Sequence, residues 1–324
     1  MHSFWNTIDR PIIALAPMAD VTDPAFRRII AQKGKPDVFW TEFVSADGLY
    51  HTRELKKLPD EDNPLMRDML YDPIEHPIVL QIFSANPDAI SYASALAIEL
   101  GFDGVDINMG CPDRSVEKQG AGAALIKDTV RAREILRSAK TAVAGALPVS
   151  VKTRIGYNSN ELATWLPELL AEEPAAVTVH ARTRKEMSKV PARWEHVTEA
   201  VAIRDALGSP TLILGNGDVV DVPQARAKAL ETGADGVMIG RGIFGNPWLF
   251  SGREPSHHER LMTLVEHCQT FEELCPHKSF AVMKKHFKAY IRDFDGASEL
   301  RAQLMEAEQA SEVAHIIEEH LKQV

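Results

Sequence analysis

Cysteine is scarce in this chain. Its 324 residues include only three cysteines, Cys111, Cys268 and Cys275. A small secreted domain held together by disulfides carries an even and dense set of cysteines. The cysteine content therefore excludes a disulfide framework and favours a reducing compartment.

Long hydrophobic runs are also missing. No apolar stretch reaches the roughly 18 residues that a membrane-spanning helix needs. Residues 1–6 lack a basic region followed by an apolar stretch, so they do not resemble a secretory signal. We therefore expect a cytoplasmic protein with no membrane partner.

Positive charge is in short supply. The chain has 36 Lys and Arg against 46 Asp and Glu, a formal net charge of -10 at pH 7. This balance argues against a protein that coats DNA, RNA or an anionic membrane without specificity, but it leaves room for a local basic patch. The 45% of hydrophobic and 25% of charged residues are typical of a globular chain and argue against a disordered one.

Short apolar runs alternate with helix-like segments through the first three quarters of the chain. Strands that are apolar on both faces and alternate with helices predict a parallel sheet. Eight such units in about 230 residues fit a (β/α)8 TIM barrel, whereas a doubly wound open sheet is the alternative. The expected strands are Ile12–Ala16, Val38–Phe43, Ile78–Phe83, Gly104–Asn108, Val149–Thr153, Ala176–His180, Thr211–Leu214 and Gly236–Ile239. The expected helices include Pro87–Leu100, Thr129–Ala144 and Pro223–Thr232.

The pattern changes after Gly252, because no strand-like run follows it. The expected helical segments are 257–274, 279–293 and 297–322, interrupted by Pro276 and Gly296. We therefore expect two domains, a barrel over residues 1–250 and an appended helical domain over residues 256–324.

The predicted strands end in polar residues. In TIM barrels, ligand-binding and reactive side chains lie at the C-terminal ends of the strands. One such residue alone is more often structural, but a ring of eight polar ends predicts a ligand site. The ends are Pro17–Asp20, Thr41–Glu42, Gln81, Asp106–Pro112, Lys152–Arg154, His180–Arg184, Gly215–Asp218 and Gly240–Gly242.

The last two strand ends predict a phosphate site. Gly215–Gly217 leaves backbone N–H groups open, and Gly240–Gly242 includes the cation of Arg241. Asn246–Pro247 is typical of the start of a short helix. In this fold, phosphate usually binds to the loops after strands seven and eight and to an added helix. The glycines leave open whether the ligand is a phosphorylated substrate or flavin mononucleotide (FMN).

Cys111 lies on the loop after the fourth predicted strand, between Gly110 and Pro112. Cysteine is most often a small buried hydrophobe. A thiol on a loop at the barrel mouth can instead act as a nucleophile or as a proton donor. Because His180 could also convert it to a thiolate, the residues alone leave its role open.

Taken together, these motifs resemble those of the tRNA-dihydrouridine synthases. The matching segments follow the family's order over about residues 11–250, and the helical tail is also what that family has. They are Ala16–Asp23 with Phe26 and Arg27, Gln81–Phe83, Gly104–Pro112, Lys118–Leu125, Val149–Gly156, Val177–His180 with Arg182–Arg184, Gly215–Asp218 and Gly233–Gly242.

The resemblance implies an FMN enzyme, without a metal, that uses NADPH to reduce a uridine of tRNA to dihydrouridine. Cys111 would protonate the uracil ring as a neutral thiol, and Asn108 would orient the base. The backbone of Pro17, Met18 and Ala19 would run beneath the isoalloxazine ring. The remaining cofactor contacts would be Gln81 and Lys152 at the polar edge of the ring, and His180, Asn216, Gly217, Asp218, Gly240 and Arg241 at the phosphate end.

A tRNA enzyme needs cations that contact phosphates. The segment 274–292 contains no acidic residue. Its basic residues are Lys278, Lys284, Lys285, Lys288 and Arg292, with His286 and Tyr290 between them. Positions 284, 288 and 292 would share one helix face, which we expect to be the main tRNA contact; a merely solvated basic face is the alternative. Further candidates near the barrel mouth are Arg27, Arg28, Arg114, Lys118 and Arg184, of which Lys118 would close over the substrate on a mobile loop. The resemblance also implies that Arg182 and Arg184 lie where contacts to the base or the tRNA backbone are expected.

Two positions depart from the pattern of many family members. Asp20 and Ala181 stand where many members have glycine, beside inferred flavin contacts. We expect no loss of function from either residue.

Two other functions fit parts of the sequence. The first keeps the flavin barrel but reduces a free pyrimidine, as dihydroorotate or dihydropyrimidine dehydrogenases do; the basic tail has no evident use there. The second is an RNA-binding or chaperone protein with a vestigial flavin pocket, and the intact Cys111 and Lys152 argue against it. Which uridine is reduced is left open, and a monomer is the default expectation.

Overall fold

The strands form one parallel sheet that curves round to meet itself. The computed structural model describes residues 3–322, and its strand order is β1-β9-β8-β7-β6-β5-β4-β2, with β3 also paired to β4. Between β1 and the start of β2, the Asp37 N–H donates to the Ile13 carbonyl at 2.9 Å and the Leu15 N–H to the Val38 carbonyl at 3.2 Å. The predicted (β/α)8 TIM barrel is therefore confirmed. The strands are β1 (Ile12–Leu15), β2 (Phe39–Trp40), β3 (Val44–Ser45), β4 (Ile78–Phe83), β5 (Gly104–Met109), β6 (Val149–Arg154), β7 (Ala176–His180), β8 (Leu212–Asn216) and β9 (Gly236–Ile239).

The second strand position differs from the prediction. The expected strand Val38–Phe43 is correct only at β2, because residues 41–43 are not in a strand and β3 follows them; β2 and β3 pair in turn with β4. The hydroxyl of Thr41 accepts the Gln81 N–H at 3.0 Å. That donor would go to a backbone carbonyl in a regular ladder, so the side chain interrupts the strand.

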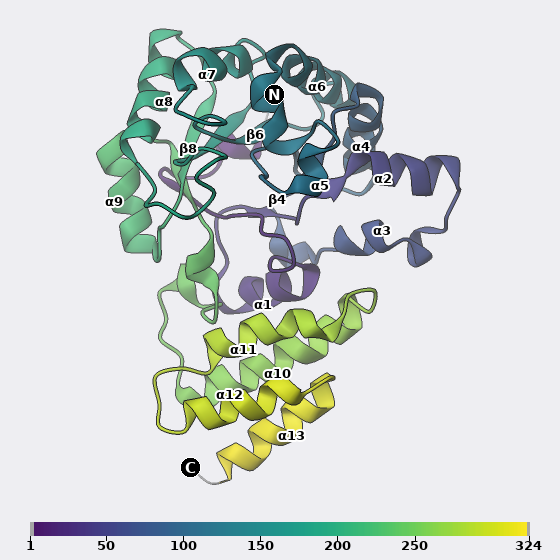
Figure 1. Ribbon diagram of the computed structural model, residues 1–324, viewed down its shortest axis with the longest axis vertical. Helices are drawn as coiled ribbons and strands as arrows, with labels where there is room; N and C mark the ends of the chain where they lie inside the picture. The colour runs from purple at the N-terminus through teal and green to yellow at the C-terminus, as the bar shows by residue number, and fades with distance from the viewer. Residues whose placement is uncertain (1–2, 323–324) are drawn as a thin grey trace.

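Helices cover the outside of the barrel (Figure 1). Seven of the nine barrel helices within residues 3–322 begin after a residue whose side chain accepts a first-turn N–H, which satisfies donors that a helix start leaves open. These residues are Asp23, Ser45, Asn63, Asn86, Asp113, Asp128 and Asp221. The barrel helices are α1 (Pro24–Gly34), α2 (Ala46–Leu49), α3 (Pro64–Asp68), α4 (Pro87–Glu99), α5 (Arg114–Glu117), α6 (Thr129–Val143), α7 (Leu162–Leu170), α8 (Glu195–Ala206) and α9 (Val222–Thr232).

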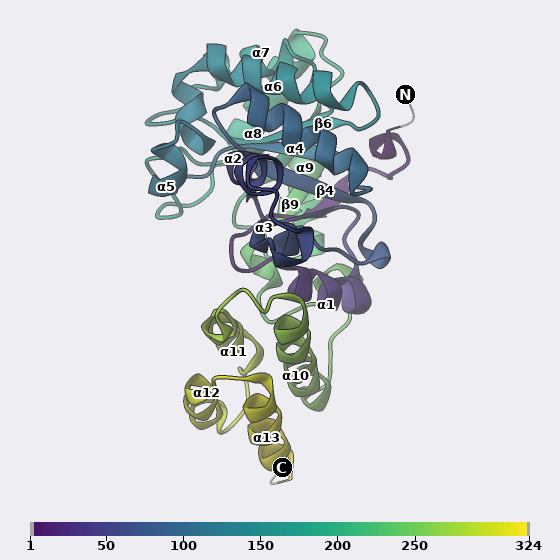
Figure 2. The same cartoon turned by 90° about the vertical axis from the view of Figure 1, so that its right-hand side faces the viewer.

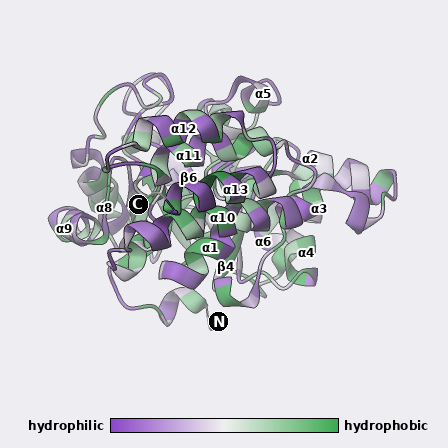
Figure 3. Ribbon diagram, turned by 90° about the horizontal axis from the view of Figure 1, so that it is seen from below, coloured by the Kyte–Doolittle hydropathy of each residue, from purple (hydrophilic) through white to green (hydrophobic). Residues whose placement is uncertain are grey.

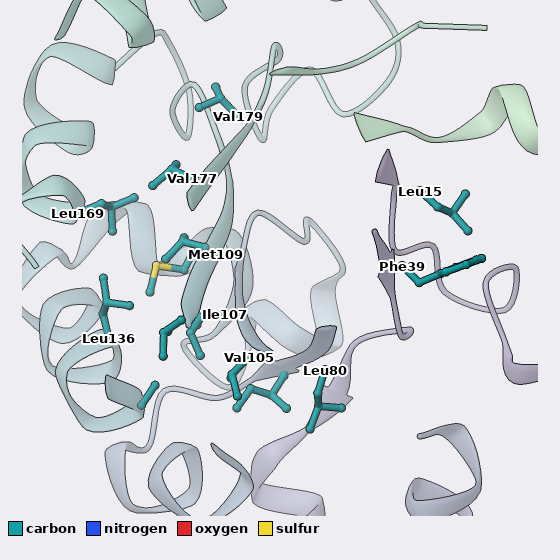
Figure 4. Close-up of a cluster of buried hydrophobic side chains, with 14 of the residues drawn as sticks. Leu15, Phe39, Leu80, Val105, Ile107, Met109, Leu136, Leu169, Val177 and Val179 are labelled. Atoms are coloured by element: carbon teal, nitrogen blue, oxygen red, sulfur yellow. The ribbon is translucent and has the colours of Figure 1, made fainter. Parts of the chain in front are cut away.

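Alternation along the strands sends apolar and polar side chains to opposite sides of the sheet. In β5, Ile107 and Met109 join the hydrophobic cluster between the barrel and its helices, which includes Leu136 of α6 (Figure 4). Asp106 and Asn108 alternate with them and bond to polar residues of the neighbouring strands. The sequence of each strand therefore fills the outer core and supplies polar groups to the barrel interior at the same time.

The helical tail, residues 256–322, lies against α1 on one side of the barrel (Figures 1 and 2). Its helices are α10 (His257–Leu274), α11 (Lys284–Tyr290), α12 (Ala297–Glu306) and α13 (Ala310–Leu321). They surround a core of their own that includes Leu264, Phe287, Leu300 and Val313. Seen from below, the tail helices are each partly hydrophilic and partly hydrophobic, as packing on one face requires (Figure 3).

The tail departs from the expected helices at two places. The segment expected at 297–322 is two helices, because Ala307 is extended and buried and the Ala310 N–H donates to a carboxylate oxygen of Glu272 in α10 at 2.8 Å. The segment expected at 279–293 is a helical turn followed by α11, which ends at Tyr290.

The description of the chain covers membrane-spanning helices and the chain ends as follows. Among residues 3–322, no helix is both long and apolar enough to cross a membrane. The outermost residues of the two expected domains, Met1, His2, Gln323 and Val324, lie outside the described residues.

Candidate active site

A cavity of about 560 Å³ opens at the C-terminal ends of the barrel strands. The structure brings most of the expected site residues into its lining: Pro17, Met18, Gln81, Asn108, Cys111, Lys152, His180, Arg182, Asn216, Gly217, Asp218, Gly240 and Arg241. Ala19, Lys118 and Arg184 were expected at the site but are not part of this lining. Lining residues that the sequence interpretation did not assign to a role include Phe43, Arg154, Ser188 and Val220.

A chain of hydrogen bonds runs from the barrel interior to the loop that carries Cys111. The carboxylate of Asp106 accepts from Ser150 Oγ and from Gln81 Nε2, both at 2.6 Å. Asn108 Nδ2 donates to Gln81 Oε1 at 3.1 Å, and Asn108 Oδ1 accepts the Cys111 N–H at 2.9 Å. Burial raises the pKa of Asp106 to about 6. The chain fixes both amide side chains in orientation.

The thiol of Cys111 is half-buried at the cavity wall. Burial raises the pKa of this thiol above its usual value. Burial, together with the positive charge of Lys152, lowers the pKa of His180 well below its usual value, so this imidazole is neutral near pH 7. A neutral imidazole cannot stabilise a thiolate by its charge, and the uncharged thiol is therefore the favoured form of Cys111.

Lys152 projects from β6 into the same cavity. Its Nζ donates to Asn216 Oδ1 at 3.2 Å, and the amide of Asn216 is itself held by the Met238 carbonyl at 2.7 Å. Burial lowers the pKa of Lys152 to about 8, and the charge of Arg154 acts in the same direction. A desolvated ammonium of this kind is suited to an anionic partner in the cavity.

Arg154 is the clearest lining residue without a predicted role. It lies two positions after Lys152, donates from Nε to the Gly110 carbonyl at 2.7 Å, and donates from Nη1 to the carbonyls of Thr183 and Met187 at 3.1 and 3.0 Å. Burial lowers its pKa to about 10. Arg154 thus ties the Cys111 loop to the loop after β7. The Lys-x-Arg spacing could have indicated this role, because side chains two positions apart in β6 lie on the same side of the sheet.

The ends of β8 and β9 form a tight, cationic corner. Gly217 has a φ of 135°, and a Cβ on it would lie 2.7 Å from the Cβ of Ala192, so this position needs glycine. The carboxylate of Asp218 lies between Arg182 and Arg241, with Arg241 Nη2 at 2.8 Å. The hydrogen bond from Arg182 lowers the pKa of Asp218. The two guanidinium groups outnumber the one carboxylate, and the backbone at Gly217 is unobstructed by a side chain, so this corner is suited to a phosphate group.

Two of the expected RNA contacts, Arg184 and Lys118, lie outside the cavity lining. Arg184 forms an ion pair with Glu117 at the end of α5, and its guanidinium lies 5.4 Å from the centre of the Tyr157 ring. Lys118 follows α5 and is exposed.

The basic face of the tail is smaller than expected. Lys284, Lys285 and Lys288 lie on α11, but the helix ends before Arg292, which pairs with Asp293 at 3.4 Å. The expectation that Arg292 continues the helix face is therefore wrong. His286, expected between the basic residues on the same surface, is buried.

Three other basic or aromatic residues serve the fold. The expectation that Arg27 contacts RNA is wrong, because the residue is fully buried and its Nε lies 2.7 Å from Glu75. Tyr290 is fully buried in the core of the tail. Lys278 is held in ion pairs with barrel carboxylates at the junction with the tail.

The sequence and the fold are similar to those of known proteins. The family model for dihydrouridine synthase (Dus) matches residues 14–324. A probable tRNA-dihydrouridine synthase 2 of Bacillus subtilis is 40% identical over 324 residues, which cover 98% of this chain and 96% of that protein. A probable tRNA-dihydrouridine synthase of Staphylococcus aureus is 39% identical, with coverage of 98% and 95%.

Solved structures share the fold at low sequence identity. Histamine dehydrogenase from Rhizobium sp. 4-9 superposes with a TM-score of 0.54 at 15% identity, covering 80% of this chain and 48% of that one. Morphinone reductase superposes with a TM-score of 0.52 at 12% identity, covering 74% and 84%. At these identities the likeness shows the fold alone.

Proposed function

The chain belongs to the dihydrouridine synthase family, and from this premise we propose that it reduces the 5,6 double bond of a uridine in tRNA. We further propose FMN as the cofactor, NADPH as the reductant and Cys111 as the proton donor. The observation that carries the proposal is a single cavity with a half-buried thiol on one wall, Lys152 on another and a glycine- and arginine-lined corner at the end of β8 and β9. Its volume of about 560 Å³ is in the range of cofactor sites.

The residues present fit a flavin mononucleotide. The corner at Gly217 and Arg241 offers backbone and positive charge to a phosphate, and Lys152 offers a cation to the polar edge of a ring. Gln81 keeps one amide N–H for that edge after its bond to Asp106. When bound, FMN supplies a hydride for C6 of the uracil ring.

The protein must then supply the proton. Hydride addition at C6 pushes negative charge toward C5 and O4, and the Cys111 Sγ–H gives its proton to C5, which yields the saturated ring. The raised thiol pKa supports this role because it keeps Sγ protonated. Solvent reprotonates the thiolate after each turnover. Asn108, which holds the loop through the Cys111 N–H, would orient the base.

The substrate base must leave its stack in order to reach the cavity. We propose that Arg184 and Lys118 contact the RNA outside the cavity, and that Lys284 and Lys288 of the tail contact its phosphates. Arg182, which is buried and bonded to Asp218, would act from inside the cavity. In this scheme residues 1–250 form the catalytic domain and residues 256–324 the tRNA-binding domain. A cytoplasmic location follows from the proposed substrate, since tRNA acts there.

The test is a direct assay of the product. The protein is incubated with NADPH and unmodified tRNA, and dihydrouridine is mapped by mass spectrometry. We expect product in the RNA and none from free uridine or uracil, which is the substrate class that the alternative function predicts and the family match does not favour. The Cys111→Ala variant should bind FMN and accept electrons from NADPH at the wild-type rate but form little dihydrouridine. Full activity of that variant would refute the proton-donor role.

A further inference from the structure

Glu42 joins the barrel to the helical tail beside the cavity. It is buried, with 5% of its surface exposed. Its Oε1 accepts the backbone N–H of Asp20, and its Oε2 accepts Lys278 Nζ at 2.6 Å. Asp20 belongs to the loop after β1, whereas Lys278 belongs to the tail. The two oxygens of one carboxylate are thus bonded to the two parts of the chain.

Asp20 is the turn residue of the loop whose Pro17 and Met18 line the cavity. Its φ of 54° is in the left-handed region, which residues other than glycine rarely adopt. Its N–H is bonded to Glu42, and its carbonyl accepts Lys285 Nζ at 2.6 Å. Both backbone groups of Asp20 are therefore held by side chains from outside the turn, and one of these side chains comes from the tail.

Lys278 supplies the positive charge on which this junction depends. Its side chain is 13% exposed and also lies 3.2 Å from Asp68 Oδ1, which His277 Nε2 approaches at 2.8 Å. Burial raises the pKa of Glu42, and Lys278 is the main group that opposes this shift. Without Lys278, Glu42 would be a buried carboxylate with no cation among the described residues within ion-pair distance.

Two other contacts between the barrel and the tail involve α1 and not the turn. Lys33 of α1 pairs with Glu266 of α10 at 2.8 Å, and Phe26 stacks on His267 with ring centres 4.8 Å apart. These contacts hold the tail on α1. They provide a matched comparison, because Lys33→Met removes an ion pair across the same junction without touching Asp20.

We propose that Glu42, Lys278 and Lys285 are positioning residues, through which the seating of the tail sets the Asp20 turn and hence the cavity wall that faces the flavin. The identity of the ligand rests on the proposed function. A tail that shifts when RNA binds would change this wall, so RNA binding and flavin binding are coupled, and by linkage each ligand affects the other by the same factor.

The first test uses Lys285, which was expected to contact RNA. Its side chain is exposed, so Lys285→Met should fold. Apoprotein is titrated with FMN in the absence of RNA, and binding is followed by the quenching of flavin fluorescence. We expect the Kd for FMN to rise about fivefold or more. A role in RNA contact alone leaves the Kd at the wild-type value, and that result would overturn the assignment for Lys285.

The second test separates the turn from simple docking. Lys278→Met should raise the Kd for FMN and alter the visible circular dichroism of the bound flavin, whereas Lys278→Arg should restore both and Lys33→Met should leave both unchanged. Equal FMN binding by Lys278→Met and Lys33→Met would overturn the proposal. If Lys278→Met does not fold, the Lys285→Met titration decides.

The proposed function and the positioning role are tested by different measurements. A wild-type protein that binds FMN but leaves tRNA unmodified refutes the proposed reaction, while the comparison of FMN Kd values still decides the positioning role. A wild type that binds no FMN overturns both.

Discussion

The side-chain oxygen of Asn108 accepts the backbone N–H of Cys111 at 2.9 Å, and it also accepts the Gly110 N–H at 3.1 Å. One acceptor therefore closes the loop that carries the proposed proton donor. Because Asn108 is itself bonded to Gln81, the position of the loop is fixed from within the barrel.

Asn108→Ala should slow the protonation step. The substitution leaves two loop N–H groups without their acceptor, and a displacement of the thiol by about 1 Å is enough to cost roughly a hundredfold in rate. Single-turnover formation of dihydrouridine measures this step. Reduction of the bound flavin by NADPH without tRNA is the control and should be unchanged; slowing of both steps alike would point to a general loss of structure.

Cys111 should be alkylated slowly. Because burial raises the pKa of its thiol, less thiolate is present at pH 8 than in a free cysteine. We expect iodoacetamide to modify Cys111 more slowly than glutathione at pH 8, with a rate that still rises above pH 9. Peptide mass spectrometry gives the rate for this residue alone. Modification faster than that of glutathione would mean a stabilised thiolate, which is unsuited to proton donation.

FMN affinity should fall as the pH rises through about 8. The pKa of Lys152 in the protein is lowered to about 8, so its ammonium predominates below that pH and is lost above it. A bound anion holds the proton on, and the Kd should then rise by up to about tenfold per pH unit above pH 8. Titrations between pH 7 and 9.5 measure this. Lys152→Met should bind FMN weakly with no such step, and identical pH curves for the two proteins would contradict the role of Lys152.

His286→Phe should make the protein less sensitive to acid. Burial lowers the pKa of His286 to about 3, whereas an unfolded histidine has a pKa of about 6.5. The unfolded state therefore binds a proton that the folded state does not, and stability falls as the pH drops below 6.5. The loss attributable to this residue is roughly 1.4 kcal/mol at pH 5.5.

Urea unfolding at pH 7.5 and 5.5 measures the acid sensitivity. Asp23, whose pKa burial raises to about 7, contributes in the opposite sense, because its folded form holds the extra proton as the pH falls. The quantity to compare is therefore the acid-induced loss in the variant against that in the wild type. The control is His258→Asn, because His258 is exposed. Between pH 7.5 and 5.5 this variant should lose as much stability as the wild type loses.

The strands and the ends that carry the site could be predicted from the sequence because the signals are local. An apolar run such as Ile78–Phe83 and the polar residue within it, Gln81, are both read from a few neighbouring residues, and barrel geometry then brings such ends together. The same reasoning placed Lys152 and Asn216 at strand ends of one site, and in the structure Lys152 Nζ donates to Asn216 Oδ1, although 64 residues separate them.

Contacts between distant parts of the chain could not be predicted in this way. Arg27 is basic and follows a predicted strand end at the barrel mouth. Its partner Glu75 lies 48 residues further along the chain, and the pair is buried. Lys278 is one of several lysines in a basic segment, and its bond to Glu42 spans 236 residues. Likewise, the break of the last helical segment at Ala307 depends on Glu272 of another helix.

The hydrogen bonds from the Cys111 N–H through Asn108 and Gln81 all point toward Asp106, which accepts from Ser150 on its other side. Gln81 and Asn108 each accept from one neighbour and donate to the next, so the role of each amide group is set by its neighbours. Gln81→Glu, for example, would replace the donor to Asp106 by an acceptor, so that position 106 would have to offer a donor in its place. During evolution, residues on three different strands would then have to change together or not at all, so a family that alters its reaction can more easily replace the rim of this cavity than its floor.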